Sequence, residues 1–182
     1  MKELSLNILD ISMNSVKAGA AEISILLEET DRTLRITVTD DGCGMTPDFL
    51  AAVTDPFTTT RTTRKVGLGI PLFKLAAEQT GGECEITSRD EAAFPADHGT
   101  RITALFYKDS IDFTPLGDVI STVTTLIQGS PDRRWIFTHI RPAGEVRLDT
   151  DELRAVLGDV PLSEPEVISW IAGYLAEQYE EA

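Results

Sequence analysis

Residues 40–45 read Asp-Asp-Gly-Cys-Gly-Met (DDGCGM) and directly follow the β-rich run LRITVT. A carboxylate therefore stands at the end of a predicted strand, where a turn begins. Glycines at positions 42 and 44 permit a sharp turn whose backbone can approach a flat ligand closely. A buried carboxylate there can accept a hydrogen bond from an exocyclic amine, such as that of adenine. An ordinary Asp-Gly turn is the alternative interpretation of the hexapeptide alone.

Upstream of this turn, residues 3 to 18 have the periodicity of a helix, which Gly19 ends. Asp10 and Asn14 lie one turn apart on one face of this predicted helix. The Asn14 amide oxygen can ligate a hard cation, and the Asp10 carboxylate can orient or deprotonate a nucleophile. The alternative interpretation is that Asp10 and Asn14 are simply exposed to solvent and bind no ligand. The predicted apolar face holds Leu4, Ile8 and Ile11 with Ser15, widened by Leu6, Leu9, Met13 and Val16.

Downstream, residues 55–72 read DPFTTTRTTRKVGLGIPL, a stretch rich in threonine and positive charge. Its glycines 67 and 69 open a predicted helix that runs to Thr80, with Leu72, Leu75 and Ala76 along one face. The free N–H groups and the dipole of a helix N-terminus favour an anion. We expect residues 57–66 to be a mobile lid that closes over a polyphosphate, or else simply a solvated loop.

The remaining elements alternate between strands and helices. Runs 21–29 and 33–40 predict an antiparallel pair, Thr46-Pro47 opens a short helix, and runs 83–90 and 100–107 predict two further strands joined by a turn-rich linker. After residue 107 the pattern predicts a helix over 115–128 and a hairpin around 142–144. Capping-box spacings, Asp149 with Glu152 and Ser163 with Glu166, predict helices near 150–158 and 164–180. We interpret residues 1–108 as an α/β core and 109–182 as a smaller α/β extension.

Composition excludes several classes of partner. The formal net charge of −14 repels nucleic acid and anionic lipid, so neither is an expected ligand. No apolar run approaches the ~20 residues of a membrane span, and the N-terminus lacks a signal-peptide pattern. The chain has two cysteines and no Cys-x-x-Cys spacing, which fits a protein of the reducing cytoplasm. We expect both cysteines to pack as small apolar residues in or near the core. Neither histidine has a partner at metal-ligand spacing.

The order of these motifs resembles the GHKL superfamily of ATPases, which includes histidine-kinase catalytic domains, type II topoisomerases, MutL proteins and anti-sigma-factor kinases. DISMNSVKAGA resembles its N box, DDGCGM its first glycine box and VGLGIPL its second. DPFTTTR resembles the phenylalanine-containing lid segment of sensor kinases, and Gly99-Thr100 matches the trailing Gly-Thr. The resemblance covers roughly residues 1 to 108, and nothing comparable covers the rest.

This resemblance implies a Bergerat fold, a two-layer α/β sandwich with helices on one face of a mixed sheet, which binds ATP and Mg²⁺. It implies that Asp10 is catalytic, that Asn14 ligates Mg²⁺ and that Asp40 binds the adenine amino group. Arg64 is a further candidate in the lid. The nucleotide-binding residues that it implies are Asn14, Asp40, Gly42, Gly44, Met45, Phe57, Thr59, Thr60, Arg61, Lys65, Gly67, Leu68, Gly69 and Thr100.

Two departures from the family pattern affect the expected activity. Hydrolytic members place Glu where Asp10 stands, and Asp is one methylene shorter. The N box begins close to Met1, so the dimerising helices that carry the phosphoacceptor histidine of sensor kinases are not expected. His139 lies in a predicted strand and is expected to pack there.

Three functions remain open: phosphoryl transfer to a partner protein or slow ATP hydrolysis, a non-catalytic ATP-responsive module, and a degenerate scaffold. The C-terminal segment leaves two roles open as well. Trp170, Ile171 and Tyr174 share one predicted helical face, with Leu175 and Gln178 beside it. We expect that face to dock on the core or on the strand RRWIFTHI. Alternatively, the segment is a platform for a protein partner or a second copy of the chain.

Overall fold

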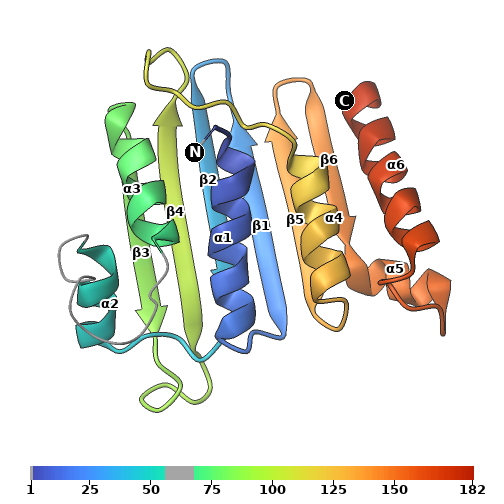
Figure 1. Cartoon of the computed structure of the whole chain (residues 1–182), viewed down its shortest axis with the longest axis horizontal. Helices are drawn as coiled ribbons and strands as arrows, with labels where there is room; N and C mark the ends of the chain where they lie inside the picture. Colours follow the sequence, from blue (N-terminus) through green and yellow to red (C-terminus); the bar gives the residue numbers. More distant parts are fainter. Residues whose placement is uncertain (1, 56–67) are drawn as a thin grey trace.

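A computed structural model describes residues 2–55 and 68–182, and within them six strands form one mixed sheet in the order β3-β4-β2-β1-β5-β6 (Figure 1). The strands are β1 Glu22–Glu29, β2 Thr33–Asp40, β3 Glu83–Arg89, β4 Gly99–Tyr107, β5 Arg134–Arg141 and β6 Gly144–Asp149. The helices are α1 Leu4–Lys17, α2 Pro47–Thr54, α3 Gly69–Gln79, α4 Val119–Gly129, α5 Thr150–Leu157 and α6 Pro165–Glu181. Helices α3, α1, α4 and α6 lie side by side on one face of the sheet, which confirms the expected two-layer architecture.

Strand pairing follows the predicted hairpins and adds two long-range pairings, β2 with β4 and β1 with β5. β1 pairs antiparallel with β2, β4 pairs antiparallel with β2 and β3, and β5 pairs antiparallel with β6. β5 also pairs parallel with β1, with Glu22 opposite Arg134 and Glu28 opposite Ile140. The segment after residue 108 therefore continues the same sheet. Its helix α4 packs on α1, and α6 packs on α4.

The core lies between the sheet and the helix layer. β1 alternates buried and half-buried residues, as expected for a strand whose second face is open to water. α1 buries Leu4, Ile8, Ile11 and Ser15, the face that its periodicity predicts. Phe73 of α3 and Phe106 of β4 are fully buried, with ring centroids 5.6 Å apart. Burial of a side chain of this size contributes about 1.5–3 kcal/mol.

The predicted orientation of α3 is wrong. The helix buries Ile70, Phe73 and Ala77, whereas Leu72 and Leu75 are 40% and 48% exposed. Because α3 is apolar around most of its circumference, periodicity could not select the buried face. On α1, Leu6 and Met13 are likewise exposed and do not widen the buried face as expected.

The C-terminal helices form close to where the sequence places them, but two begin differently. α4 starts at Val119 instead of residue 115, because the Asp118 side chain accepts a hydrogen bond from the Ser121 N–H (2.9 Å). α6 starts at Pro165 after Glu164, and the predicted cap by Ser163 does not form. Glu164 is the N-cap residue of α6 instead, and its side chain makes no capping hydrogen bond.

α6 docks through a different set of side chains than expected. Val167, Ile171 and Leu175 are buried, whereas Trp170 is 54% and Tyr174 is 38% exposed. The rings of Trp170 and Tyr174 stack on each other at 5.1 Å on the solvent side. None of the helices in the described part of the chain is long and apolar enough to cross a bilayer.

A buried polar cluster joins α6 to the sheet. His139 of β5 is 2% exposed; its Nε2 lies 2.9 Å from Glu29 Oε2 and its Nδ1 lies 2.8 Å from the Tyr179 hydroxyl. Lys108 Nζ donates to Glu29 Oε1 at 2.6 Å, and the Arg141 guanidinium lies over the Tyr179 ring. His139 therefore packs inside the structure, as expected.

Burial lowers the pKa of His139 and outweighs the opposing hydrogen bond with Glu29. Burial acts to raise the pKa of Glu29, but the hydrogen bond and charge of Lys108, with the His139 hydrogen bond, bring that pKa below its ordinary value. The cluster at neutral pH is therefore a neutral imidazole that donates to an ionised carboxylate and accepts from the Tyr179 hydroxyl.

Acidification should weaken the fold through His139. Its folded pKa lies below the unfolded value near 6.5, so the unfolded chain binds more protons and stability falls as pH drops below about 6.5. One such group contributes at most about 1.4 kcal/mol per pH unit. Urea unfolding at pH 7 and pH 5.5 should show this loss in the wild type and a smaller loss in His139→Gln. The other histidine, His98, is present in both proteins, so a difference between them reports on His139 alone. Equal losses would contradict the role given to His139.

Candidate functional site

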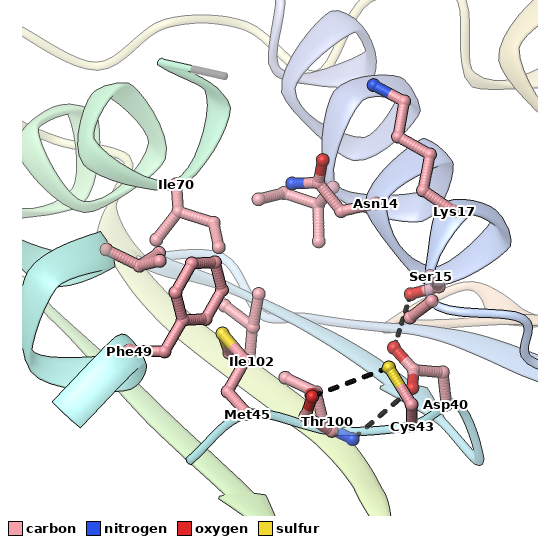
Figure 2. A pocket seen from close by; sticks show the side chains of 14 residues that line it. Asn14, Ser15, Lys17, Asp40, Cys43, Met45, Phe49, Ile70, Thr100 and Ile102 are labelled. Atoms are coloured by element: carbon pink, nitrogen blue, oxygen red, sulfur yellow. Dashed lines mark hydrogen bonds between the residues drawn. The ribbon is translucent and has the colours of Figure 1, made fainter. Parts of the chain in front are cut away.

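A cavity of about 420 Å³ opens between α1, α2 and α3 above the ends of β2 and β4 (Figure 2). α1 supplies one wall, while α2 and the start of α3 supply the opposite wall. The lining residues are Ile11, Asn14, Ser15, Lys17, Ala18, Asp40, Cys43, Gly44, Met45, Phe49, Val53, Ile70, Thr100 and Ile102. A largely apolar cavity of this size with a few polar groups is typical of a small-molecule site.

Asp40 at the end of β2 is the carboxylate of this cavity, and three elements hold it. Its Oδ2 accepts a hydrogen bond from Ser15 Oγ of α1 at 2.5 Å. Its Oδ1 accepts from the Gly42 N–H at 2.9 Å and from the Thr100 N–H of β4 at 3.3 Å. A carboxylate offers about four acceptor positions, so one remains on Oδ2 for a donor in the cavity.

The glycines after Asp40 are required by close packing. A Cβ at residue 42 would lie 2.8 Å from Ala18 Cβ, and one at residue 44 would overlap the Arg89 carbonyl oxygen. Gly44 also has a φ of +68°, which favours glycine. Between them, Cys43 is exposed, which corrects the expectation that both cysteines lie in or near the core.

The start of β4 closes the other side of the turn. Gly99 has a φ of +135°, and a Cβ there would overlap the Asp40 carbonyl oxygen. Thr100 Oγ1 lies 2.8 Å from Ser88 Oγ, which also accepts from the Met45 N–H at 2.8 Å. The predicted Gly-Thr pair therefore contacts both the carboxylate and the glycine turn.

Two further polar residues of α1, Asp10 and Asn14, precede Ser15 along the helix. Asn14 is half-buried and lines the cavity, whereas Asp10 is exposed. A Cβ at Gly69 would lie 3.2 Å from Asp10 Cβ, so Asp10 stands beside the N-terminus of α3. Leu68 at the N-cap of α3 makes no side-chain capping hydrogen bond, and the N-terminus of a helix favours an anion.

Several predicted residues cannot be placed relative to this cavity. Phe57, Thr59, Thr60, Arg61, Arg64, Lys65 and Gly67 lie outside the described residues, as does the predicted lid. Leu68, the first residue described after that gap, is exposed. Their roles therefore stay predictions.

Residues 1–110 match the sequence profile of the family described as histidine kinase-, DNA gyrase B-, and HSP90-like ATPase. The chain belongs to this family. The match contains Asp10, Asn14, the glycine turn and Gly99-Thr100. Of these, Asn14, Gly44 and Thr100 line the cavity, and Asp10 lies beside Gly69 at the start of α3.

Curated relatives of this ATPase family member include sensor kinases. The sensor histidine kinase ZraS of Salmonella typhi is 35% identical over 85 residues, which cover 44% of this chain and 18% of that protein. A probable C4-dicarboxylate sensor kinase of Bacillus subtilis (strain 168) is 30% identical over 95 residues, which cover 52% of this chain and 17% of the relative. The chain spans less than a fifth of the length of these two relatives.

Solved structures support the fold of this family member over more of its length. The Aquifex aeolicus MutL ATPase domain complexed with ADP has a TM-score of 0.53 at 12% identity, covering 86% of this chain and 69% of that one. The N-terminal domain of a DNA repair protein also has a TM-score of 0.53, at 14% identity, covering 82% and 52%. Both coverages exceed the part of the chain that the family profile matches, so the shared fold includes residues after 110.

The structure adds candidate site residues that the sequence did not predict. Ser15 was predicted only as a core position, although its hydroxyl holds Asp40. Lys17, one turn after Asn14, lines the cavity with an exposed side chain. Its spacing from Asp10 and Asn14 was the available signal. For the apolar lining residues Phe49, Val53 and Ile102, the sequence shows only that they are hydrophobic and does not indicate that they line a cavity.

Two glycine-to-alanine variants should separate backbone strain from steric overlap in the turn. Gly19 and Gly44 both have positive φ, but a Cβ at Gly19 meets nothing within 4 Å. Gly19→Ala should cost about 1–2 kcal/mol, the price of the conformation alone. Gly44→Ala should cost ~2 kcal/mol more, because it must displace the Arg89 carbonyl. Urea unfolding measures both, and equal losses would mean that β3 does not pack against residue 44.

Proposed function

We propose that the protein binds ATP with Mg²⁺ in this cavity and acts on the γ-phosphate, by transfer to a partner protein or by slow hydrolysis. The observation that carries the proposal is the hydrogen bonding of the Asp40 carboxylate. Three hydrogen bonds from the protein fix its carboxylate, and one acceptor position is left toward an apolar cavity. That arrangement selects a flat ligand with an exocyclic amine, such as adenine.

At the end of the cavity that we assign to adenine, apolar side chains complement the flat base and Asp40 supplies the polar contact. Met45, Phe49 and Ile70 face the Asp40 side of the cavity from the opposite wall (Figure 2). These side chains offer apolar contact to the faces of a planar base and exclude water from the Asp40 hydrogen bond. Guanine presents an oxygen where adenine presents its amine, so the same carboxylate should reject it.

The phosphate end lies toward α1 and the N-terminus of α3. Asn14 supplies an oxygen that suits Mg²⁺, and Lys17 supplies a positive charge at the same wall. The N–H groups and the dipole at the start of α3, which the Leu68 side chain does not cap, suit a phosphate oxygen. In this proposal Arg61, Arg64 and Lys65 of the predicted lid add cationic contacts, and Phe57, Thr59, Thr60 and Gly67 complete the site.

Asp10 decides between an enzyme and a binding module. It is exposed and stands beside Gly69, at the end of the cavity that we assign to the phosphates. A carboxylate there can accept a proton from an attacking water or from a hydroxyl of a partner protein. In the alternative, Asp10 is catalytically idle and ATP binding changes the surface shown to a partner or to a second copy of the chain.

Asp40→Asn should weaken ATP binding by about 1.5–3 kcal/mol, because a hydrogen bond to a charged acceptor is lost. The preference for ATP over GTP should fall with it. Isothermal titration of both nucleotides measures these changes. Asp41→Asn is the matched control: it makes the same change in charge one residue away, where Asp41 Oδ1 accepts from the Ala21 and Glu22 N–H groups. Equal ATP affinity in wild type and Asp40→Asn would refute the assignment of the adenine site.

Incubation with γ-labelled ATP, alone and with proteins from the same cell, tests the activity. We expect label on a partner protein or release of labelled phosphate, and loss of either in Asp10→Asn with nucleotide binding retained. Binding without any turnover would favour the regulatory module. A wild-type protein that binds no ATP would refute both functions.

A further inference from the structure

We propose that His98 is a positioning residue for the nucleotide site: it holds the Gly42 carbonyl and thereby fixes the turn that carries Asp40. The inference rests on the proposed function, but it concerns a residue outside the motifs that led to that function. His98 lies in the connection between β3 and β4 and is not among the residues that line the cavity.

The hydrogen bond of His98 is short and fixes the tautomer of the ring. Its Nδ1 lies 2.6 Å from the Gly42 carbonyl oxygen. A carbonyl oxygen only accepts hydrogen bonds, so Nδ1 must carry the proton and donate. The other ring nitrogen, Nε2, lies 4.0 Å from Glu91 Oε1. The side chain is 24% exposed, so the bond is shielded from most competing water.

The same connection holds the next carbonyl of the turn. The Glu91 N–H donates to the Cys43 carbonyl oxygen at 2.9 Å. Two consecutive carbonyls of the turn are thus bound by residues 91 and 98, at opposite ends of one loop. From the other side, the Cys43 N–H donates to the Ala18 carbonyl at 2.9 Å. The peptide units of the turn are held by both neighbours, which limits their rotation.

Gly42 transmits this restraint to the carboxylate. Its carbonyl accepts from His98, and its N–H donates to Asp40 Oδ1 at 2.9 Å. The tripeptide His98-Gly99-Thr100 makes three adjacent contacts with the turn. His98 binds the Gly42 carbonyl, Gly99 packs on the Asp40 carbonyl oxygen, and the Thr100 N–H donates to Asp40 Oδ1 at 3.3 Å. Loss of the His98 bond should let the Gly42 peptide rotate and move the Asp40 acceptor.

Three substitutions separate the donor from the volume of the side chain. Asparagine carries its amide nitrogen on Cγ, the same place in the bonding pattern as the histidine Nδ1, and can donate to Gly42. Glutamine carries its nitrogen one bond farther out, at the place of Nε2. Alanine removes the donor altogether. A positioning role therefore predicts that His98→Asn resembles the wild type, whereas His98→Gln and His98→Ala do not.

Nucleotide affinity is the first measurement. Titration with ADP, which needs no turnover, should show binding about 3–10-fold weaker in His98→Ala and His98→Gln, the value of one hydrogen bond. His98→Asn should stay within about twofold of the wild type. Equal affinity in all four proteins would overturn the proposal. So would equal weakening by asparagine and glutamine, because that result would point to packing alone.

A second measurement works without nucleotide and separates this proposal from the proposed function. Nitrogen-15 spectra of the histidine ring in the free protein should show a proton on Nδ1. Amide exchange at Gly42 and Cys43 should be slow in wild type and His98→Asn and faster in His98→Gln and His98→Ala. An Nε2–H tautomer, or unchanged exchange in every variant, would refute the role of His98 even if ATP binds. If no nucleotide binds but exchange follows this order, His98 still positions the turn and only the proposed ligand is wrong.

Discussion

The arrangement of this site depends on the hydrogen bonds that the protein must supply to a single carboxylate, that of Asp40. Asp40 takes its hydrogen bonds from α1, from the glycine turn and from the start of β4, so it ties the helix layer to two strands. A half-buried carboxylate without such partners would cost several kcal/mol, and moving any one element would impose part of that cost. The demand for donors at Asp40 therefore fixes how α1 lies over the sheet and how β4 enters it. The cavity is the space that remains above this junction.

Short-range chemistry made much of this site predictable from the sequence. Gly42, Gly44 and Gly99 have backbone requirements that only glycine meets without strain, and their spacing marks the turn before any contact is known. Asp10 and Asn14 are placed on one helix by periodicity alone. The capping by Thr46 and Asp149 likewise depends on residues next to them in the chain. In each case the deciding interaction spans only a few residues.

Contacts between residues far apart in the chain, and the faces that helices bury, were not predictable in the same way. Ser15 and His98 meet the Asp40 turn across 25 and 56 residues of chain, and nothing local marks either as its partner. The buried face of α3 was mistaken because Leu72 and Leu75 are as apolar as Ile70 and Phe73. On α6 the predicted docking face held Trp170, Ile171 and Tyr174, but of these only Ile171 is buried. The helix packs on α4 and β6. Shape complementarity selected these faces, and hydropathy does not encode it.

The parallel pairing of β1 with β5 has a consequence for the order in which the protein is made. β1 is complete at Glu29, but its outer edge stays unpaired until β5 ends at Arg141. At ordinary rates of translation that interval is on the order of ten seconds. Throughout it, the ribosome carries an N-terminal unit with an open strand edge, which can recruit other chains. A gene cut after residue 110, where the family match ends, would make that exposure permanent. In the complete sheet β5 covers this edge of β1, and β6 in turn pairs with β5.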